Sequence, residues 1–133
     1  MTIAKGARLP STTFTKMTED GPEPVTSDEY FAGRTVAVFS VPGAFTPTCS
    51  AKHLPGFFDK AGALKEKGVD EIACTSVNDA FVMGAWNTAQ GSEDIVMLAD
   101  GNAEFAEALG LTMDGSKFGM GKRSQRYSMI VND

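Results

Sequence analysis

The chain has 133 residues, of which 42% are hydrophobic and 22% are charged. These fractions are typical of a globular protein and exclude a disordered chain, and the length suits one domain with a sizeable core. Seventeen acidic residues against twelve basic ones give a net charge of −5, which argues against a nucleic-acid partner.

No stretch of the sequence approaches the roughly 18 consecutive apolar residues that a membrane-spanning helix needs. The N-terminal sequence, MTIAKGARLP, lacks the apolar segment of a secretory signal peptide. We therefore expect a soluble protein of the cytoplasm that has no membrane partner.

The first half of the chain predicts two strands and one long helix. A short strand is expected at residues 12–16, and the Pro-rich sequence that follows reads as a turn in which residues 26–31 form a helical turn. The nearly continuous β-branched run at 35–41 predicts a strand buried on both faces. From 46 to 67, apolar side chains spaced three and four apart predict a helix that Pro55 kinks.

The second half of the chain continues to alternate strands with helices. Its predicted elements are strands at 71–77, 95–100 and 126–132, and helices at 78–90 and 102–110. Asn78 or Asp79 is expected to cap the first of these helices, and Gly110 to end the second. Because strands alternate with helices, we expect parallel crossover connections and hence a layered α/β fold.

The sequence VPGAFTPTCS follows the strand predicted at 35–41. Pro42 and Gly43 end that strand, because neither residue continues a central ladder well. Thr46 suits the N-cap of the next helix and Pro47 its first position, which places Cys49 in the first turn. The unpaired N–H groups and the helix dipole at that point favour an anion, so this thiol is expected to ionise readily.

On the residues alone, two interpretations of this segment remain open. In the first, Cys49 is a reactive thiolate beside the Thr46 hydroxyl, which can donate and accept hydrogen bonds. In the second, Thr46 only caps the helix and Cys49 is a small, inert hydrophobic residue. The spacing of Cys49 and Cys74 fits no metal site, and a single histidine, His53, allows no cluster of imidazole ligands. With only two cysteines, a reactive thiol in a reducing compartment is favoured over a disulfide between them.

Pro42, Thr46 and Cys49 match the signature P-x-x-x-T-x-x-C, and through it the chain resembles the peroxiredoxins. The runs VPGAFTPTCSAKHLPGF and SVNDAFVMGAW resemble the type-five subfamily, and the similarity continues through LADGNAEFAEALG and RSQRYSMIVND. The resemblance implies a thioredoxin-like fold with a central mixed β-sheet flanked by helices, as a single domain over residues 1–133. In the family, another strand and a closing helix follow the segment that matches RSQRYSMIVND. The given sequence ends at that segment, so we expect this domain to lack those two elements.

Peroxiredoxins reduce hydrogen peroxide, organic hydroperoxides and peroxynitrite with a cysteine thiolate. The resemblance implies that Cys49 attacks the peroxide and becomes a sulfenic acid, that Thr46 hydrogen-bonds the peroxide, and that Pro42 shields the sulfur. The arginine that the family requires matches Arg126, whose permanent charge would stabilise the thiolate and the negative charge that develops on oxygen. Arg123 is the weaker candidate for this role. No cofactor and no metal are implied.

The resemblance also implies how the enzyme is reduced and assembled. The subfamily's resolving cysteine, where present, lies near the C-terminus, and this chain has none there. Cys74 lies within an apolar strand, which favours an inert buried thiol, so we expect a one-cysteine cycle with glutathione, glutaredoxin or thioredoxin as reductant. Phe45, Phe81 and Trp86 match positions in the subfamily's homodimer contact, with ordinary core packing as the other interpretation. Phe118 is expected to line an apolar mouth that favours alkyl hydroperoxides.

Other functions occur on a similar scaffold. A thiol-disulfide reductase would use C-x-x-C, but Thr46 takes the first position, and a cysteine-dependent phosphatase would need C-x-x-x-x-x-R, but Pro55 stands at that offset. A non-catalytic or chaperone-like binding module remains the alternative, because a fold does not determine chemistry. Such a module would have no need for the four residues of the expected catalytic set.

Overall fold

The structure is a computed structural model that describes residues 3–46, 56, 60–91 and 95–132. The strands are β1 (Thr13–Thr18), β2 (Gly21–Thr26), β3 (Thr35–Ser40), β4 (Glu71–Ser76), β5 (Ile95–Ala99), β6 (Thr112–Asp114), β7 (Lys122–Ser124) and β8 (Tyr127–Asn132). The helices are α1 (Ser27–Phe31), α3 (Ala61–Glu66), α4 (Ala80–Gln90) and α5 (Glu104–Leu109), with a 3₁₀ turn at Ser116–Phe118. None of these helices is long and apolar enough to cross a membrane.

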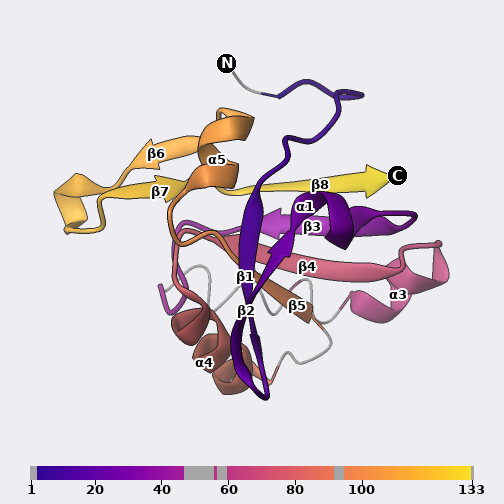
Figure 1. Ribbon diagram of the computed structural model, residues 1–133, viewed down its shortest axis with the longest axis horizontal. Helices are drawn as coiled ribbons and strands as arrows, with labels where there is room; N and C mark the ends of the chain where they lie inside the picture. The colour runs from indigo at the N-terminus through magenta and orange to yellow at the C-terminus, as the bar shows by residue number, and fades with distance from the viewer. Residues whose placement is uncertain (1–2, 47–55, 57–59, 92–94, 133) are drawn as a thin grey trace.

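Six of the described strands form one mixed sheet in the order β2-β1-β5-β4-β3-β8 (Figure 1). The three central strands, β5, β4 and β3, run parallel to one another, and their outer neighbours pair antiparallel. β6 and β7 form a separate antiparallel pair. The layered α/β arrangement predicted from the alternation of strands and helices is therefore confirmed.

The core lies on both faces of this sheet, because the central strands send successive side chains to opposite sides. In β3, Phe39 packs in a cluster with Trp86 of α4, while its neighbour Val38 packs in a second cluster with Phe105 of α5. Helices α4 and α3 cover one face, and α1 and α5 cover the other (Figure 1). The prediction of a strand buried on both faces is thus confirmed for β3.

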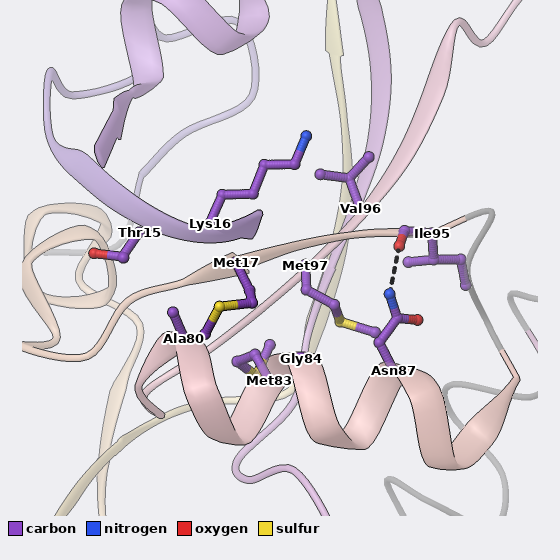
Figure 2. A pocket seen from close by; sticks show the side chains of 10 residues that line it. All are labelled: Thr15, Lys16, Met17, Ala80, Met83, Gly84, Asn87, Ile95, Val96 and Met97. Carbon is purple, nitrogen blue, oxygen red and sulfur yellow. Dashed lines mark hydrogen bonds between the residues drawn. The ribbon is translucent and has the colours of Figure 1, made fainter. Parts of the chain in front are cut away.

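Methionine side chains fill the contact between α4 and the strands above it. Figure 2 shows Met17 of β1 and Met97 of β5 pointing toward the helix, around a pocket of about 180 Å³. A Cβ at Gly84 would lie 3.3 Å from both Cβ and Cγ of Met17, so glycine lets β1 approach the helix. Flexible thioether side chains suit such an irregular gap.

The Pro-rich segment after β1 was predicted as a turn, and this prediction is wrong for residues 21–26. These residues form β2, which pairs antiparallel with β1 and places Pro22 opposite Met17 and Pro24 opposite Thr15. β2 lies at the edge of the sheet, where a proline without an N–H group is tolerated. The helical turn predicted at 26–31 is confirmed as α1, with Thr26 as its N-cap.

The helix predicted from residue 46 to 67 is described only in part. Residue 56 is helical, and α3 ends at Glu66, one residue before the predicted end. Cys49, His53 and the expected kink at Pro55 lie outside the described residues.

Short elements between α5 and β8 were not predicted. β6 and β7 have three residues each, and the 3₁₀ turn joins them. Strands of this length are too short to show a hydrophobic period. Their register places Arg123 opposite Met113, and the pair reaches the end of the molecule at which β3 ends (Figure 1).

Candidate active site

Residues 42–46, which carry the first part of the motif, leave the carboxyl end of β3 as a tight turn, called the motif turn below. The Thr46 hydroxyl donates to the Gly43 carbonyl at 2.7 Å, and the Thr46 N–H donates to the same oxygen at 3.4 Å. Phe45 lies within this turn at φ 64° and is half exposed. A non-glycine residue in that left-handed region costs about 1 kcal/mol or more, and such strain persists only where the surroundings hold it.

Gly43 leaves little room for a larger residue, because neighbouring side chains approach it closely. A Cβ at this position would lie 3.0 Å from Cγ2 of Thr46, 3.2 Å from Cε of Met120 and 3.4 Å from Nη1 of Arg123. Gly43 is itself buried. The turn that holds Thr46 is therefore packed against residues that come from far along the chain.

Asn78 ties the motif turn to the neighbouring strand. Its Oδ1 accepts hydrogen bonds from the Ala44 N–H at 3.0 Å and from the Ser76 hydroxyl at 2.6 Å. Of the two residues predicted as possible caps of α4, Asp79 is the N-cap, and it accepts from the Val82 N–H at 2.8 Å. Sequence reasoning did not assign Asn78 to the site, although parallel strands bring their carboxyl ends to one edge of a sheet.

Arg126 lies just before β8, which pairs antiparallel with β3. The last pair in this register joins Ser40 to Tyr127, so one further step along both strands brings Arg126 opposite Val41. A second link joins the end of β3 to β7, just before Arg126, because the Ser40 and Ser124 hydroxyls are 2.6 Å apart. The backbone of Arg126 thus lies beside the point at which the motif turn begins.

Of the expected catalytic set, the structure brings Pro42, Thr46 and Arg126 to the carboxyl end of β3. The side chains of Pro42 and Thr46 are half buried, and Arg126 is exposed. Cys49, the residue on which the chemistry depends, lies outside the described residues, so its place relative to this group stays a prediction.

Comparison with known proteins identifies the family to which this arrangement belongs. The Redoxin family model matches residues 4–133 of the chain. The chain belongs to the peroxiredoxin family. It is 56% identical to reduced Prx3 from Vibrio vulnificus, whose crystal structure in complex with H₂O₂ superposes with a TM-score of 0.95 over 98% of this chain and 82% of that one. This likeness confirms the thioredoxin-like fold.

Curated relatives agree with that assignment. The chain is 53% identical to the chloroplastic peroxiredoxin-2E-2 of Oryza sativa, over 99% of this chain and 61% of the relative. It is 47% identical to the hybrid peroxiredoxin hyPrx5 of Haemophilus influenzae, over 100% of this chain and 55% of the relative. The chain therefore spans between half and two thirds of the length of these two relatives.

The second cysteine of this peroxiredoxin lies in the core. Cys74 is on β4, between Phe39 and Met97 of the adjacent strands, and it has no exposed surface. The prediction that this thiol is buried is confirmed. Its lack of a resolving role remains a prediction.

A buried carboxylate stands at the carboxyl end of β5. Asp100 accepts hydrogen bonds from the Phe105 and Ala106 N–H groups, at 3.1 and 3.0 Å, and so holds the first turn of α5. Burial raises the pKa of Asp100 above its usual value, while the backbone hydrogen bonds oppose this shift. The loops at this end of the sheet are thus fixed by side chains that accept from backbone N–H groups.

The aromatic residues matched to the subfamily's dimer contact fall into two groups. Phe45 and Phe81 are 53% and 66% exposed, whereas Trp86 has no exposed surface and packs in the core. For Trp86, the interpretation as ordinary core packing is therefore correct. Phe118, in the 3₁₀ turn, is 82% exposed, so its side chain is accessible to a partner or a substrate.

Proposed function

We propose that this peroxiredoxin is a thiol-dependent peroxidase, which reduces hydrogen peroxide and alkyl hydroperoxides with Cys49 as the peroxidatic thiolate. The family assignment, together with the intact motif P-x-x-x-T-x-x-C, carries this proposal. The position of Arg126 beside the start of the motif turn supports it. So does the complex of the related Vibrio Prx3 with H₂O₂.

In this proposal, Thr46 orients the peroxide. Its hydroxyl proton is engaged, because it donates to the Gly43 carbonyl at 2.7 Å. The lone pairs of the same oxygen therefore remain to accept a hydrogen bond from the O–H group of a hydroperoxide. A peroxide held in this way has a fixed direction for its O–O bond, which is the condition for attack by the sulfur in line with that bond.

The chemical step is a two-electron transfer from sulfur to oxygen. The Cys49 thiolate forms an S–O bond to one peroxide oxygen as the O–O bond breaks, and the second oxygen leaves with the bonding pair. The Arg126 guanidinium stabilises the charge on that leaving oxygen, which takes up a proton to become water or an alcohol. Cys49 is left as a sulfenic acid.

We propose a one-cysteine cycle for the return to the thiolate. A first thiol, from glutathione, glutaredoxin or thioredoxin, attacks the sulfenic sulfur, forms a mixed disulfide and releases water. A second thiol then releases Cys49. The burial of Cys74 within β4 supports this cycle. A thiol with no exposed surface cannot reach a sulfenic acid at the protein surface without a local opening of the sheet. The cytoplasm, where these reductants keep thiols reduced, is the compartment that we propose.

Rapid mixing with hydrogen peroxide tests the proposal. The wild-type protein and a Cys74→Ala variant should form the sulfenate at equal rates, and a Cys49→Ser variant should form none. Arg126→Gln should slow the step by about 10²-fold, the effect expected for loss of one stabiliser of transition-state charge. A wild-type Cys49 that reacts no faster than free cysteine would refute the peroxidase.

Turnover assays then identify the reductant. Peroxide consumption is compared between glutathione with glutaredoxin and thioredoxin with its reductase, at equal concentrations of the peroxiredoxin. Loss of turnover in folded Cys74→Ala would contradict the one-cysteine cycle and assign a resolving role to Cys74.

We also propose that the protein is a homodimer. Phe45 and Phe81 are exposed, and the turn that contains Phe45 is joined to the start of α4, which contains Phe81, by the hydrogen bond between Ala44 and Asn78. Exposed aromatic side chains that gather on one region are typical of a protein interface. Sedimentation equilibrium should give a dimer for the wild type and a monomer for Phe81→Asp, and a monomeric wild type would contradict the proposal.

A further inference from the structure

Arg123 occupies a place in the site that the resemblance to the family does not explain. It lies in β7, and its guanidinium reaches the point where three segments meet: the motif turn at 42–46, the end of β4, and the turn at 115–121. We propose that Arg123 is a positioning residue, which locks the motif turn to the two neighbouring loops and so holds Thr46 in place. The part of this inference that concerns catalysis rests on the proposed peroxidase function.

Two hydrogen bonds fix the guanidinium. Its Nε donates to the carbonyl oxygen of Met120 at 2.9 Å, and its Nη1 donates to the carbonyl oxygen of Val77 at 3.0 Å. Hydrogen bonds from a charged donor are stronger than those between neutral groups. Both acceptors are backbone carbonyls, one in the turn at 115–121 and one just after β4, so the charged guanidinium joins these two segments.

The fixed guanidinium packs directly on the motif turn. Nη1 lies 3.4 Å, and Met120 Cε 3.2 Å, from the point that a Cβ of Gly43 would occupy. Gly43 in turn provides the carbonyl that accepts from the Thr46 hydroxyl. The contacts therefore run from Arg123 through Gly43 to the side chain that is proposed to orient the peroxide.

The base of Arg123 is also anchored close to the site. Its neighbour Ser124 is buried, and the Ser124 hydroxyl lies 2.6 Å from that of Ser40, at the end of β3. The turn before β7 is closed by hydrogen bonds from the Met120 N–H to the Gly115 carbonyl and from the Gly115 N–H to the Gly121 carbonyl. A planar fork on a fixed base holds two carbonyls at once, which a single flexible ammonium group does not reproduce.

Three variants test this inference. Arg123→Gln removes the fork, Arg123→Lys keeps the charge without the fork, and Lys122→Gln is the matched control, because it removes the adjacent cation, which pairs with Glu107 away from the turn. Amide hydrogen exchange at Ala44 and Thr46 should rise about tenfold in Arg123→Gln, less in Arg123→Lys, and not in the control.

Kinetics separate positioning from a direct effect on the sulfur. The rate constant for peroxide should fall about tenfold in Arg123→Gln, because a small displacement of a substrate-orienting group is costly. The pH dependence of Cys49 alkylation by iodoacetamide should stay as in the wild type, since that reaction does not need Thr46. A rise in the thiol pKa in Arg123→Gln that Arg123→Lys does not show would overturn the positioning role in favour of an electrostatic one.

Two further results would also refute the inference. One is unchanged exchange at Ala44 and Thr46 in folded Arg123→Gln, and the other is a wild-type rate with peroxide in that variant. If Arg123→Gln fails to fold, the same two measurements, amide exchange at Ala44 and Thr46 and the rate constant for peroxide, are made on Arg123→Lys instead. If the wild-type protein itself lacks peroxidase activity, the proposed function fails, whereas the exchange measurements still decide whether Arg123 holds the turn.

Discussion

A methyl group added at Gly43 is the most direct perturbation of the motif turn. In Gly43→Ala, the new Cβ would lie 3.0 Å from Cγ2 of Thr46 and 3.2 Å from Cε of Met120. Carbon atoms in contact prefer about 3.5–4.0 Å. Thr46 must therefore move by about 0.5 Å, while the flexible end of Met120 can adjust more easily.

Both stability and rate should respond to that shift. Overpacking at a buried position costs about 1–3 kcal/mol of unfolding free energy. A misplacement of about 1 Å can cost 10²-fold in rate, so a shift of half that size should slow the reaction of Cys49 with peroxide by about tenfold. The variant should thus be both less stable and slower, although it changes no group that takes part in the chemistry.

Urea unfolding and rapid mixing with peroxide measure the two effects. Gly62→Ala is the matched control, because a Cβ there meets nothing within 4 Å and the residue lies in α3, where alanine should stabilise by about 0.5–1 kcal/mol. Gly43→Ala with Thr46→Ser should regain part of the lost stability, since serine lacks the methyl group that the new Cβ meets. A Gly43→Ala protein with wild-type stability and rate would refute the close packing of this turn.

Three further changes test other parts of the site. Asn78→Ala should lower the unfolding free energy by about 1–3 kcal/mol in urea, because the buried Ala44 N–H loses its acceptor; an equal loss in Asn78→Asp, which keeps an acceptor, would contradict this. Asp79→Ala should cost about 1 kcal/mol through loss of the α4 cap, with the peroxide rate unchanged. Because burial raises the pKa of Asp100 above 3.8, the native state binds its proton more tightly than the unfolded state, so this residue's contribution to stability falls as pH rises through the folded pKa. Urea unfolding across acidic and neutral pH should lose that dependence in Asp100→Asn, and an unaltered pH profile would count against it.

Local patterns in the sequence were enough for most of the central elements. The β-branched run at 35–41 predicted β3 because a strand with helices on both faces can be apolar at every position. Asn78 or Asp79 was expected to start α4, and the structure has Asp79 as its N-cap; Gly110 ends α5 as predicted. Such caps can be predicted because they satisfy backbone groups within one turn of the chain. The motif of Pro42, Thr46 and Cys49 identified the family in the same way, since its spacing is contained within eight residues.

Elements whose stability comes from distant partners escaped this kind of reasoning. β2 contains Pro22 and Pro24, which suggested a turn, and it is a strand only because it lies at an edge where those residues need no N–H partner. Trp86 matched a position in a family interface, and the packing of α4 on the sheet placed it in the core instead. Neither outcome can be read from a residue's immediate neighbours in the sequence.

The sequence by itself thus determined the family, the main strands and helices, and the residues expected to carry the chemistry, because each depends on patterns a few residues long. Only the tertiary structure decided which side chains hold the motif turn. Asn78 and Arg123 lie 34 and 80 positions after Ala44 and Gly43, and they meet the turn because parallel strands end at one edge of the sheet and the β6–β7 pair folds back on it. Contacts of that kind are set by the topology of the chain, which no short stretch of sequence contains.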